Sequence, residues 1–236
     1  MTAPKKVLVA WSTGKDSAWM LHVLREHDRD VEVAALLTTT EQGDGRTGVH
    51  GVQRALRSAQ ADATGLPSID VPLPRERSNA AYEAGMARAV AEARARFGIT
   101  HVAFGDLFLE DIRRYREKQF AGSGLGLLFP LWQVPTPALA RRMIAGGLRA
   151  RLVVVDTTRL DATFAGRAFD DALLTDLPPA VDPCGENGEF HTFAFDGPMF
   201  RVPIAHRIDR ISEGERFVHA ELSGASEPRL AQTIVL

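Results

Sequence analysis

The first two thirds of the chain alternate short apolar runs, rich in β-branched residues, with longer segments of helical periodicity. This pattern predicts strands at 7–11, 31–37, 68–73, 100–105 and 152–156, and helices at 17–27, 52–63, 79–97, 109–120 and 138–145. Such an alternation is typical of right-handed βαβ units, which build a parallel sheet covered by helices. Pro72 has no N–H to donate and therefore places its strand at an edge of that sheet.

The pattern changes after about residue 180. Segments 189–195, 200–211 and 216–222 have the character of antiparallel strands, with turns at 196–198 and 213–215. A smaller α+β part is therefore expected to follow the parallel sheet. We expect two domains, with residues 1–135 forming the first and residues 136–236 forming the second.

Composition and charge exclude several classes of protein. The apolar runs are far shorter than the roughly 20 residues of a transmembrane helix, and residues 1–6 show no signal-peptide core, so we expect a cytoplasmic protein without a membrane partner. The net charge of −2 gives no reason to expect a nucleic-acid partner. The single cysteine, Cys184, excludes an intramolecular disulfide framework and a multi-cysteine zinc site. A homo-oligomer is compatible with the sequence, which does not decide the oligomeric state.

A polar loop follows the first strand and opens the first helix. Residues 12–17 read STGKDS. Free N–H groups at a helix N-terminus, hydroxyl groups and a cation are what a phosphate needs, and Lys15 stands out in a chain with so few lysines beside its arginines. Asp16 fits better as an N-terminal helix carboxylate or as a ligand of Mg²⁺. The alternative is a capped strand–helix turn with Ser12 or Asp16 as the N-cap.

The loop is neither a Walker A sequence nor a G-x-G-x-x-G fingerprint. It resembles the S-G-G-x-D-S signature of the PP-loop ATP pyrophosphatases, which split ATP into AMP and pyrophosphate. Thr13 departs from that signature, which has glycine at this position. If the position needs a positive φ, Thr13 is strained; if not, the substitution is harmless.

Three further stretches narrow the resemblance. Residues 105–117 read GDLFLEDIRRYRE, residues 125–132 read LGLLFPLW, and residues 184–193 read CGENGEFHTF. Together with the loop, and in this order, they resemble the diphthine–ammonia ligase family and its bacterial relatives. The resemblance implies a Rossmann-like α/β domain of the adenine nucleotide alpha-hydrolase (PP-loop) type, followed by a smaller substrate-facing domain.

The resemblance also implies a reaction. ATP with Mg²⁺ would adenylate a carboxylate and release pyrophosphate, and ammonia would displace AMP to leave an amide. The acceptor would be protein-bound diphthine or, because the arginine-rich composition hints at a bacterium, a small carboxylic acid. A different class of function is a module that senses ATP or AMP without turnover, and pyrophosphate release separates the two.

The expected site is drawn from these stretches and from two residues outside them, Thr38 and His50. Its catalytic residues are Lys15, Asp16, Asp106, Glu186 and Glu189, with Asp16 as the metal ligand. Its nucleotide-binding residues are Ser12, Thr13, Gly14, Lys15, Asp16, Ser17, Thr38, His50 and Gly105. Its substrate-binding residues are Glu110, Arg113, Cys184, Gly185, Asn187 and His191.

Geometry follows from this assignment. Because the acceptor must approach the α-phosphorus, segment 184–191 should fold over the carboxyl ends of the first and fourth strands, with Glu186 and Glu189 pointing inward. Structural alternatives stay open for some residues. A helix face shared by Glu110, Arg113, Arg114 and Glu117 could be a solvated, salt-bridged surface, although Glu110 and Arg113 lie closer to the end of the fourth strand, where ligands bind. His50 could face solvent, and Trp11 is expected to pack in the core.

Overall fold

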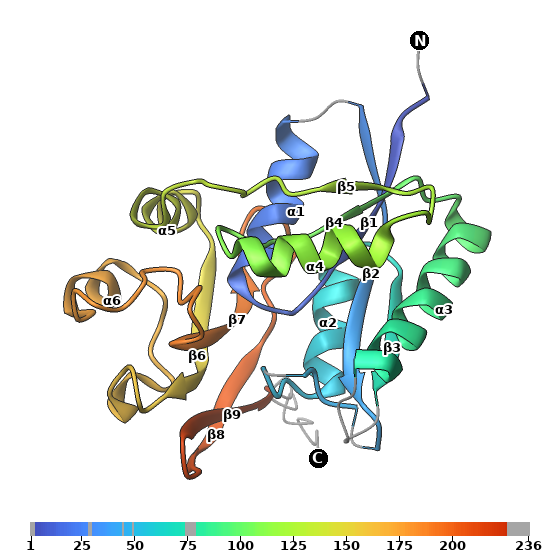
Figure 1. Cartoon of the computed structure of the whole chain (residues 1–236). Coiled ribbons are helices and arrows are strands. Elements are labelled where there is room, and N and C mark those ends of the chain that lie inside the picture. Colours follow the sequence, from blue (N-terminus) through green and yellow to red (C-terminus); the bar gives the residue numbers. More distant parts are fainter. Residues whose placement is uncertain (1–2, 28–29, 44, 49, 74–78, 226–236) are drawn as a thin grey trace, which may run out of the picture.

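The computed structural model describes residues 3–27, 30–43, 45–48, 50–73 and 79–225. Two sheets organise it (Figure 1). The first sheet has five parallel strands in the order β3-β2-β1-β4-β5. Its strands are β1 (Lys5–Ala10), β2 (Val31–Glu41), β3 (Ser68–Leu73), β4 (His101–Ala103) and β5 (Gly126–Leu128). The strand order switches direction between β1 and β4, and ligands of open α/β sheets bind at the carboxyl ends of the strands at such a point.

Helices cover both faces of the parallel sheet. They are α1 (Lys15–His27), α2 (Arg54–Thr64), α3 (Asn79–Phe97), α4 (Glu110–Phe120) and α5 (Thr136–Ala145). Alternate β1 residues divide the core, because Val7 and Val9 pack with α1 whereas Leu8 packs with α3 on the opposite face. No helix within the described residues is both long and apolar enough to cross a bilayer.

The second sheet is antiparallel, in the order β7-β6-β9-β8. Its strands are β6 (Arg149–Asp156), β7 (Phe190–Asp196), β8 (His206–Glu213) and β9 (Phe217–Gly224), and η1 (Ala162–Phe164) and α6 (Asp171–Asp176) lie between β6 and β7. Helix α2 packs against this sheet through Leu56, next to Phe193 and Leu222, and α1 contacts β7. The second sheet therefore covers the α1–α2 side of the first (Figure 1).

The predicted parallel sheet is confirmed, and so is the edge position of β3 beside β2. Two features differ from the sequence prediction. Residues 126–128, for which the sequence pattern predicts no strand, form β5. The alternation also ends earlier than expected, because β6 pairs antiparallel with β7 and β9 in the second sheet. A buried apolar run predicts a strand but carries no information about the direction of its partners.

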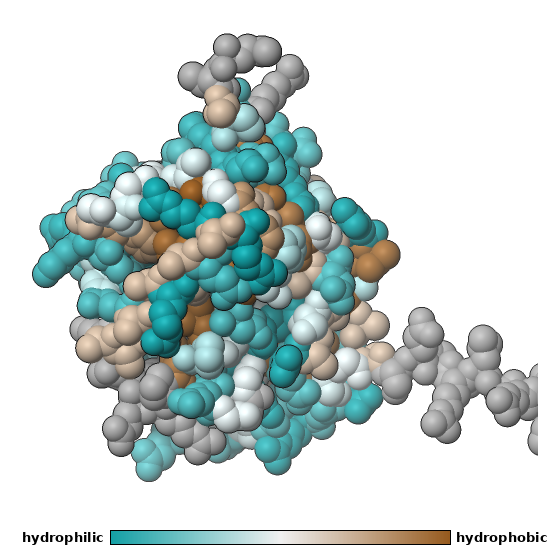
Figure 2. All heavy atoms as spheres, turned by 90° about the vertical axis from the view of Figure 1, so that its right-hand side faces the viewer, coloured by the Kyte–Doolittle hydropathy of each residue, from teal (hydrophilic) through white to brown (hydrophobic). Residues whose placement is uncertain are grey.

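The side of the molecule that carries α3 is mainly hydrophilic, with hydrophobic side chains visible among polar ones (Figure 2). A cavity of about 730 Å³ lies between α3 and α4, lined by apolar side chains such as Met86, Val90 and Phe120. It is separate from the cavity at the carboxyl ends of β1 and β4, although both include Met86.

Candidate active site

Residues 12–17 form the loop between β1 and α1 and are held by their own hydroxyl groups. Ser17 Oγ donates to the Gly14 carbonyl at 3.0 Å, and Ser12 N donates to Ser17 Oγ at 3.3 Å. The two serine hydroxyl oxygens lie 3.1 Å apart. The loop therefore presents the N-terminus of α1, with Asp16 in its first turn, toward the carboxyl end of the sheet.

Thr13 adopts a φ of 73°, the left-handed region that β-branched residues avoid. Its side chain is fully buried, and its hydroxyl has no hydrogen-bond partner in the described structure. The carbonyl of Thr13 accepts from Ala194 N and from Gln60 Nε2, both at 3.0 Å. The neighbouring sheet and helix thus hold a conformation that would suit glycine, so the departure from the family signature introduces strain.

Two glycines allow close approach of backbone to backbone. A Cβ on Gly14 would lie 2.7 Å from His50 Cε1 and 3.2 Å from the Thr192 carbonyl. A Cβ on Gly105 would lie 3.3 Å from the backbone of Asp16. Gly14 therefore lets β7 approach the loop, and Gly105 lets the turn after β4 approach the start of α1.

Lys15 is directed into the contact between the two sheets and is 2% exposed. Its ammonium donates to Asp16 Oδ1 at 3.0 Å, to Asp16 Oδ2 at 2.8 Å, and to the carbonyl of Cys184. It also lies 5.6 Å from the centroids of the Phe169 and Phe190 rings. Burial alone would lower the pKa of Lys15, but Asp16 and the other acidic groups around it outweigh burial and raise it. The expected contact of Lys15 with phosphates stays a prediction.

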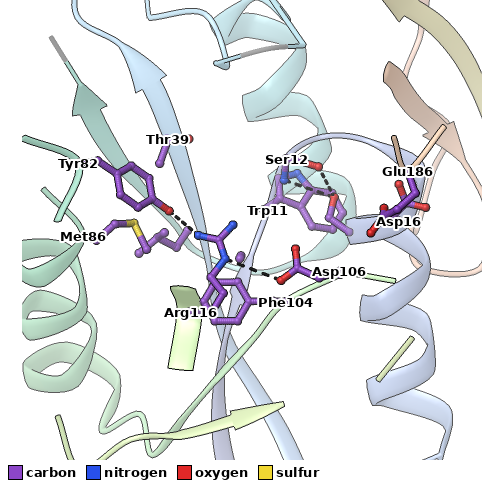
Figure 3. A pocket seen from close by; sticks show the side chains of 14 residues that line it. Trp11, Ser12, Asp16, Thr39, Tyr82, Met86, Phe104, Asp106, Arg116 and Glu186 are labelled. Carbon is purple, nitrogen blue, oxygen red and sulfur yellow. Dashed lines mark hydrogen bonds and ion pairs between the residues drawn. The ribbon is translucent and has the colours of Figure 1, made fainter. Parts of the chain in front are cut away.

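A cavity of about 250 Å³ lies at the carboxyl ends of β1 and β4 (Figure 3). Six of the expected site residues line it, namely Ser12, Asp16, Ser17, Gly105, Asp106 and Glu186. The rest of its lining was not expected: Ala10, Trp11, Leu37, Thr39, Tyr82, Met86, Phe104 and Arg116. Trp11 packs as predicted, edge-on to Phe200, and also borders the cavity.

Glu186 reaches this cavity from the segment before β7. Its Oε1 accepts from Leu107 N at 2.9 Å and from Phe108 N at 3.4 Å, just beyond β4. Burial raises the pKa of Glu186 to about 7; these hydrogen bonds oppose the shift, and the nearby Asp16 carboxylate adds to it. The expected return of segment 184–191 to the loop and the fourth strand is therefore confirmed, as is the inward orientation of Glu186.

Glu189 is buried too, but its hydrogen bonds are made within the segment before β7. Its Oε1 accepts from Asp182 N and from Asn187 Nδ2, both at 3.1 Å, while its Oε2 is buried without a partner in the described structure. Asp182 Oδ1 in turn accepts from Cys184 N at 2.9 Å and Glu186 N at 3.2 Å. Glu189 and Asn187 therefore shape the turn that presents Glu186, with Gly185 at a φ of 68° within it.

Cys184 is a buried thiol rather than a reactive one. Burial raises its pKa to about 12, although the nearby Lys15 ammonium works in the opposite direction. Its Sγ lies 3.5 Å from the Thr136 carbonyl. A neutral, enclosed thiol is neither a nucleophile nor a metal ligand, so Cys184 contributes to the site through its carbonyl.

His50 and His191 lie behind the loop, with ring centroids 5.0 Å apart. His50 Nδ1 is 2.9 Å from the Thr192 carbonyl, so it carries the proton as a donor to that oxygen. Burial lowers the pKa of both rings, to about 3 for His191, where His50 and Lys15 add to the effect. Both imidazoles are therefore neutral near pH 7. His50 is not the solvent-facing residue that the alternative predicted.

Thr38, Glu110 and Arg113 are also outside the lining of the cavity. Thr38 is buried, and its neighbour Thr39 lines the cavity instead, because successive strand residues face opposite sides of a sheet. Glu110 is exposed in the first turn of α4. Arg113 donates to Glu117 at 2.9 Å and lies over the rings of Phe129 and Trp132, which supports the structural alternative for this helix face.

Arg116 and Gln60 are two polar residues of the site that the sequence analysis did not identify. Arg116 lies one turn from Ile112 and one from Phe120, on the side of α4 that faces the sheet. A charge within an apolar helical stripe was the available signal. Gln60 is completely buried, accepts from Trp11 Nε1 at 3.0 Å and donates to the carbonyls of Thr13 and Ala194. It holds α2 to the loop and to β7.

Comparisons with known proteins agree with this architecture. The family model of the diphthamide synthase N-terminal domain matches residues 5–126, and that of the diphthamide synthase C-terminal domain matches residues 136–225. Over 85 residues the chain is 35% identical to the diphthine–ammonia ligase of Schizosaccharomyces pombe. That match covers 34% of this chain and 14% of the yeast protein, so it spans a small part of the relative. The two domain matches cover both sheets, and the chain belongs to the diphthamide synthase family.

Proposed function

We propose that the chain is an ATP-dependent ligase that adenylates a carboxylate and converts it to an amide with ammonia. The observation that carries the proposal is one cavity that joins the loop at 12–17, the turn after β4 and Glu186 of the second domain. An adenylating ligase needs a phosphate-binding element beside groups that handle an acceptor and an amine. The family membership and the named relative support the same class of reaction.

The loop at 12–17 would hold the phosphates of ATP. Ser12 and Ser17 line the cavity, the Ser12 hydroxyl offers a donor, and the first turn of α1 adds free N–H groups and the positive end of the helix dipole. Lys15 acts in this scheme by holding Cys184 and Asp16 in place. The phosphates would therefore meet a loop whose shape is stabilised by the second domain.

Asp16 fits a magnesium ion that is bound mainly by phosphates. The described residues contain no group of three or more His, Cys, Asp or Glu side chains that could form a protein cage for a metal. Mg²⁺ in nucleotide sites usually takes one or two carboxylates together with phosphate oxygens and water. Asp16 lines the cavity beside Ser12 and Ser17, so it is the residue to hold the ion, which would neutralise charge on the leaving pyrophosphate.

The first chemical step would join the acceptor to AMP. A carboxylate oxygen attacks the α-phosphorus, the bond from that phosphorus to the pyrophosphate oxygen breaks, and pyrophosphate leaves with the electron pair. In-line attack requires the acceptor opposite the leaving group at about 3–3.5 Å. Glu186 borders the cavity on the side away from Tyr82, and the acceptor would enter there (Figure 3).

The second step would form the amide. Ammonia attacks the carbonyl carbon of the acyl adenylate, AMP leaves with the electron pair of the broken C–O bond, and nitrogen must lose one proton. Glu186, with its pKa near 7, is the base for that proton and for the ammonium ion that delivers the nitrogen. The scheme needs no covalent nucleophile, in keeping with the buried, neutral thiol of Cys184.

The acceptor is proposed as protein-bound diphthine or a small carboxylic acid. Incubation with α-labelled ATP, magnesium, ammonium and candidate acids should yield AMP and pyrophosphate, and ¹⁵N-ammonium should appear in the product amide. Asp16→Asn should lower AMP formation, whereas Asp111→Asn, at an exposed position on α4, should leave it unchanged. ADP as the main product would refute the proposal. ATP binding without any AMP, across all acids tried, would favour the sensor alternative.

A further inference from the structure

Asp106 and Arg116 form a loose ion pair at the middle of the candidate nucleotide cavity. Asp106 Oδ2 and Arg116 Nε are 3.7 Å apart, which is too long for a hydrogen bond. Both of these atoms are buried, and neither has a hydrogen-bond partner among the described residues. Buried donors and acceptors are rarely left in this state, because an unmade hydrogen bond leaves the cost of desolvation uncompensated.

The surroundings of Arg116 hold its guanidinium in place. Nη1 donates to Tyr82 Oη at 2.7 Å, and the guanidinium carbon lies 4.7 Å from the centre of the Phe104 ring. The side chains of Asp106 and Arg116 are only 18% and 21% exposed, and both line the cavity. The pair is thus a preformed element of the cavity wall.

The charge and hydrogen-bonding capacity of the pair select the ligand group. The positive charge of Arg116 is already balanced by Asp106, so the pair has little net attraction for another phosphate or carboxylate. A carboxylate can only accept and would be repelled by Asp106, whereas an ammonium can only donate and would be repelled by Arg116. A hydroxyl group can donate to the carboxylate and accept from the guanidinium at the same time. Two atoms 3.7 Å apart can both lie about 2.8 Å from one such oxygen.

The position of the pair indicates which part of the nucleotide carries the hydroxyl. In Figure 3, Asp106 lies between Arg116 on one side and Asp16 with Glu186 on the other. The loop at 12–17 borders one end of the cavity, and Tyr82 and Met86, which suit an apolar base, lie on the opposite side of Arg116 from Asp106 (Figure 3). A nucleotide with its phosphates at the loop would place its sugar between the loop and these two residues, beside Asp106 and Arg116.

We infer that Asp106 and Arg116 bind a hydroxyl of the nucleotide ribose, at C2′ or at C3′, and thereby select nucleotides that carry it. The inference rests on the proposed use of ATP and assigns Asp106 to the sugar rather than to the catalytic role expected from the sequence. Burial raises the pKa of Asp106, against the influence of Arg116, so a hydroxyl donated to the carboxylate would also stabilise its ionised form.

The test compares ATP, 2′-deoxy-ATP and 3′-deoxy-ATP in equilibrium binding to the full chain. One of the two analogues should bind the wild-type protein about 10- to 100-fold more weakly than ATP, as expected for a hydrogen bond to charged groups. Asp106→Ala should weaken ATP binding by a similar factor and bind ATP and that analogue equally well. Arg114→Ala, at an exposed position on α4, the helix that carries Arg116, should keep the wild-type discrimination between ATP and the analogue.

The outcomes separate this inference from the proposed function. Equal binding of all three nucleotides to the wild-type protein would overturn the ribose assignment while leaving ATP use intact. No binding of any of them would overturn both. If Asp106→Ala fails to fold, Asp106→Asn is compared with the wild-type protein for binding of the same three nucleotides. A folded Asp106→Asn protein that binds ATP with unchanged affinity and still discriminates against the analogue would contradict the role of the carboxylate.

Discussion

The ammonium of Lys15 donates a hydrogen bond to the main-chain carbonyl of Cys184, which lies 169 residues further along the chain. The loop at 12–17 is thus attached, next to the Asp16 carboxylate, to the segment that carries Glu186. Thr192 completes the attachment, because its Oγ1 accepts from Lys15 N at 3.0 Å. Any movement of the second domain away from the loop must expose the buried charge of Lys15, so the two parts of the site are energetically coupled.

Lys15→Met should therefore lower the free energy of unfolding by about 2–4 kcal/mol. The methionine keeps the aliphatic stem but leaves the Cys184 carbonyl and the Asp16 carboxylate without their shared donor. Asp16 is 28% exposed and can recover some hydration, which places the cost below that of a fully enclosed pair. Urea unfolding followed by circular dichroism measures the change.

Lys118→Met provides the matched control, because Lys118 is exposed on α4. Its free energy of unfolding should change by less than about 0.5 kcal/mol. Equal midpoints for Lys15→Met and the wild-type protein would contradict the structural attachment.

Thr13→Gly should stabilise the protein by about 1 kcal/mol. Glycine relieves the left-handed backbone of a β-branched residue and removes a buried hydroxyl without a partner, which together cost about 2–4 kcal/mol. The gain is reduced by the greater chain entropy of unfolded glycine and by the lost contacts of the methyl group. Gln133→Gly is the control, since Gln133 has a φ of 58° at an exposed position. A lower unfolding midpoint for Thr13→Gly would show that its packing outweighs its strain.

The parallel sheet could be predicted because the strands at 31–37, 68–73 and 100–105 alternate along the chain with amphipathic or alanine-rich helices. Local periodicity also located α3 at its observed bounds, Asn79–Phe97. What periodicity could not supply was the partner of each later strand. β6 is apolar and buried like a parallel strand, and only the return of β7 and β9 makes it antiparallel.

The site was predictable where chemistry was concentrated in sequence. Ser12, Asp16, Asp106 and Glu186 were found because loops at the ends of parallel strands bind ligands and because the segment 184–191 is unusually polar. Arg116 was missed since the face of α4 that meets the sheet depends on how the helix packs. The direction of the Lys15 side chain was also out of reach, because its partner Cys184 is brought there by the whole second domain.

Cys184 should resist alkylation in the native state. Its pKa of about 12 leaves almost no thiolate at pH 8, and its side chain is 2% exposed. Iodoacetamide at pH 8 should therefore modify the folded protein orders of magnitude more slowly than the protein unfolded in concentrated urea, as followed by intact mass. Rapid native labelling would mean that the contact around Lys15 and Cys184 opens readily.

Glu186 should make the stability of the protein depend on pH in a specific direction. Its folded-state pKa of about 7 lies above the ordinary value of 4.5, so between these values the folded state binds more protons than the unfolded state. Stability contributed by this group is therefore full below about pH 4.5, falls as pH rises toward 7, and stays at its reduced level above. After discounting for solvent screening at a partly exposed group, the loss is about 1–2 kcal/mol.

Glu186→Gln keeps the shape of the side chain but cannot ionise, so it should escape this loss. The free energy of unfolding of the variant minus that of the wild-type protein should be larger at pH 8 than at pH 5 by about 1–2 kcal/mol, as measured by urea unfolding at both pH values. Glu215→Gln, at an exposed position between β8 and β9, should show no such difference. In the same preparation Glu186→Gln should bind ATP like the wild-type protein but form amide more slowly, because it cannot accept the proton of ammonia. A pH-independent stability difference would mean that Glu186 is not the carboxyl group with the raised pKa, and its assignment as the base would lose its physical reason.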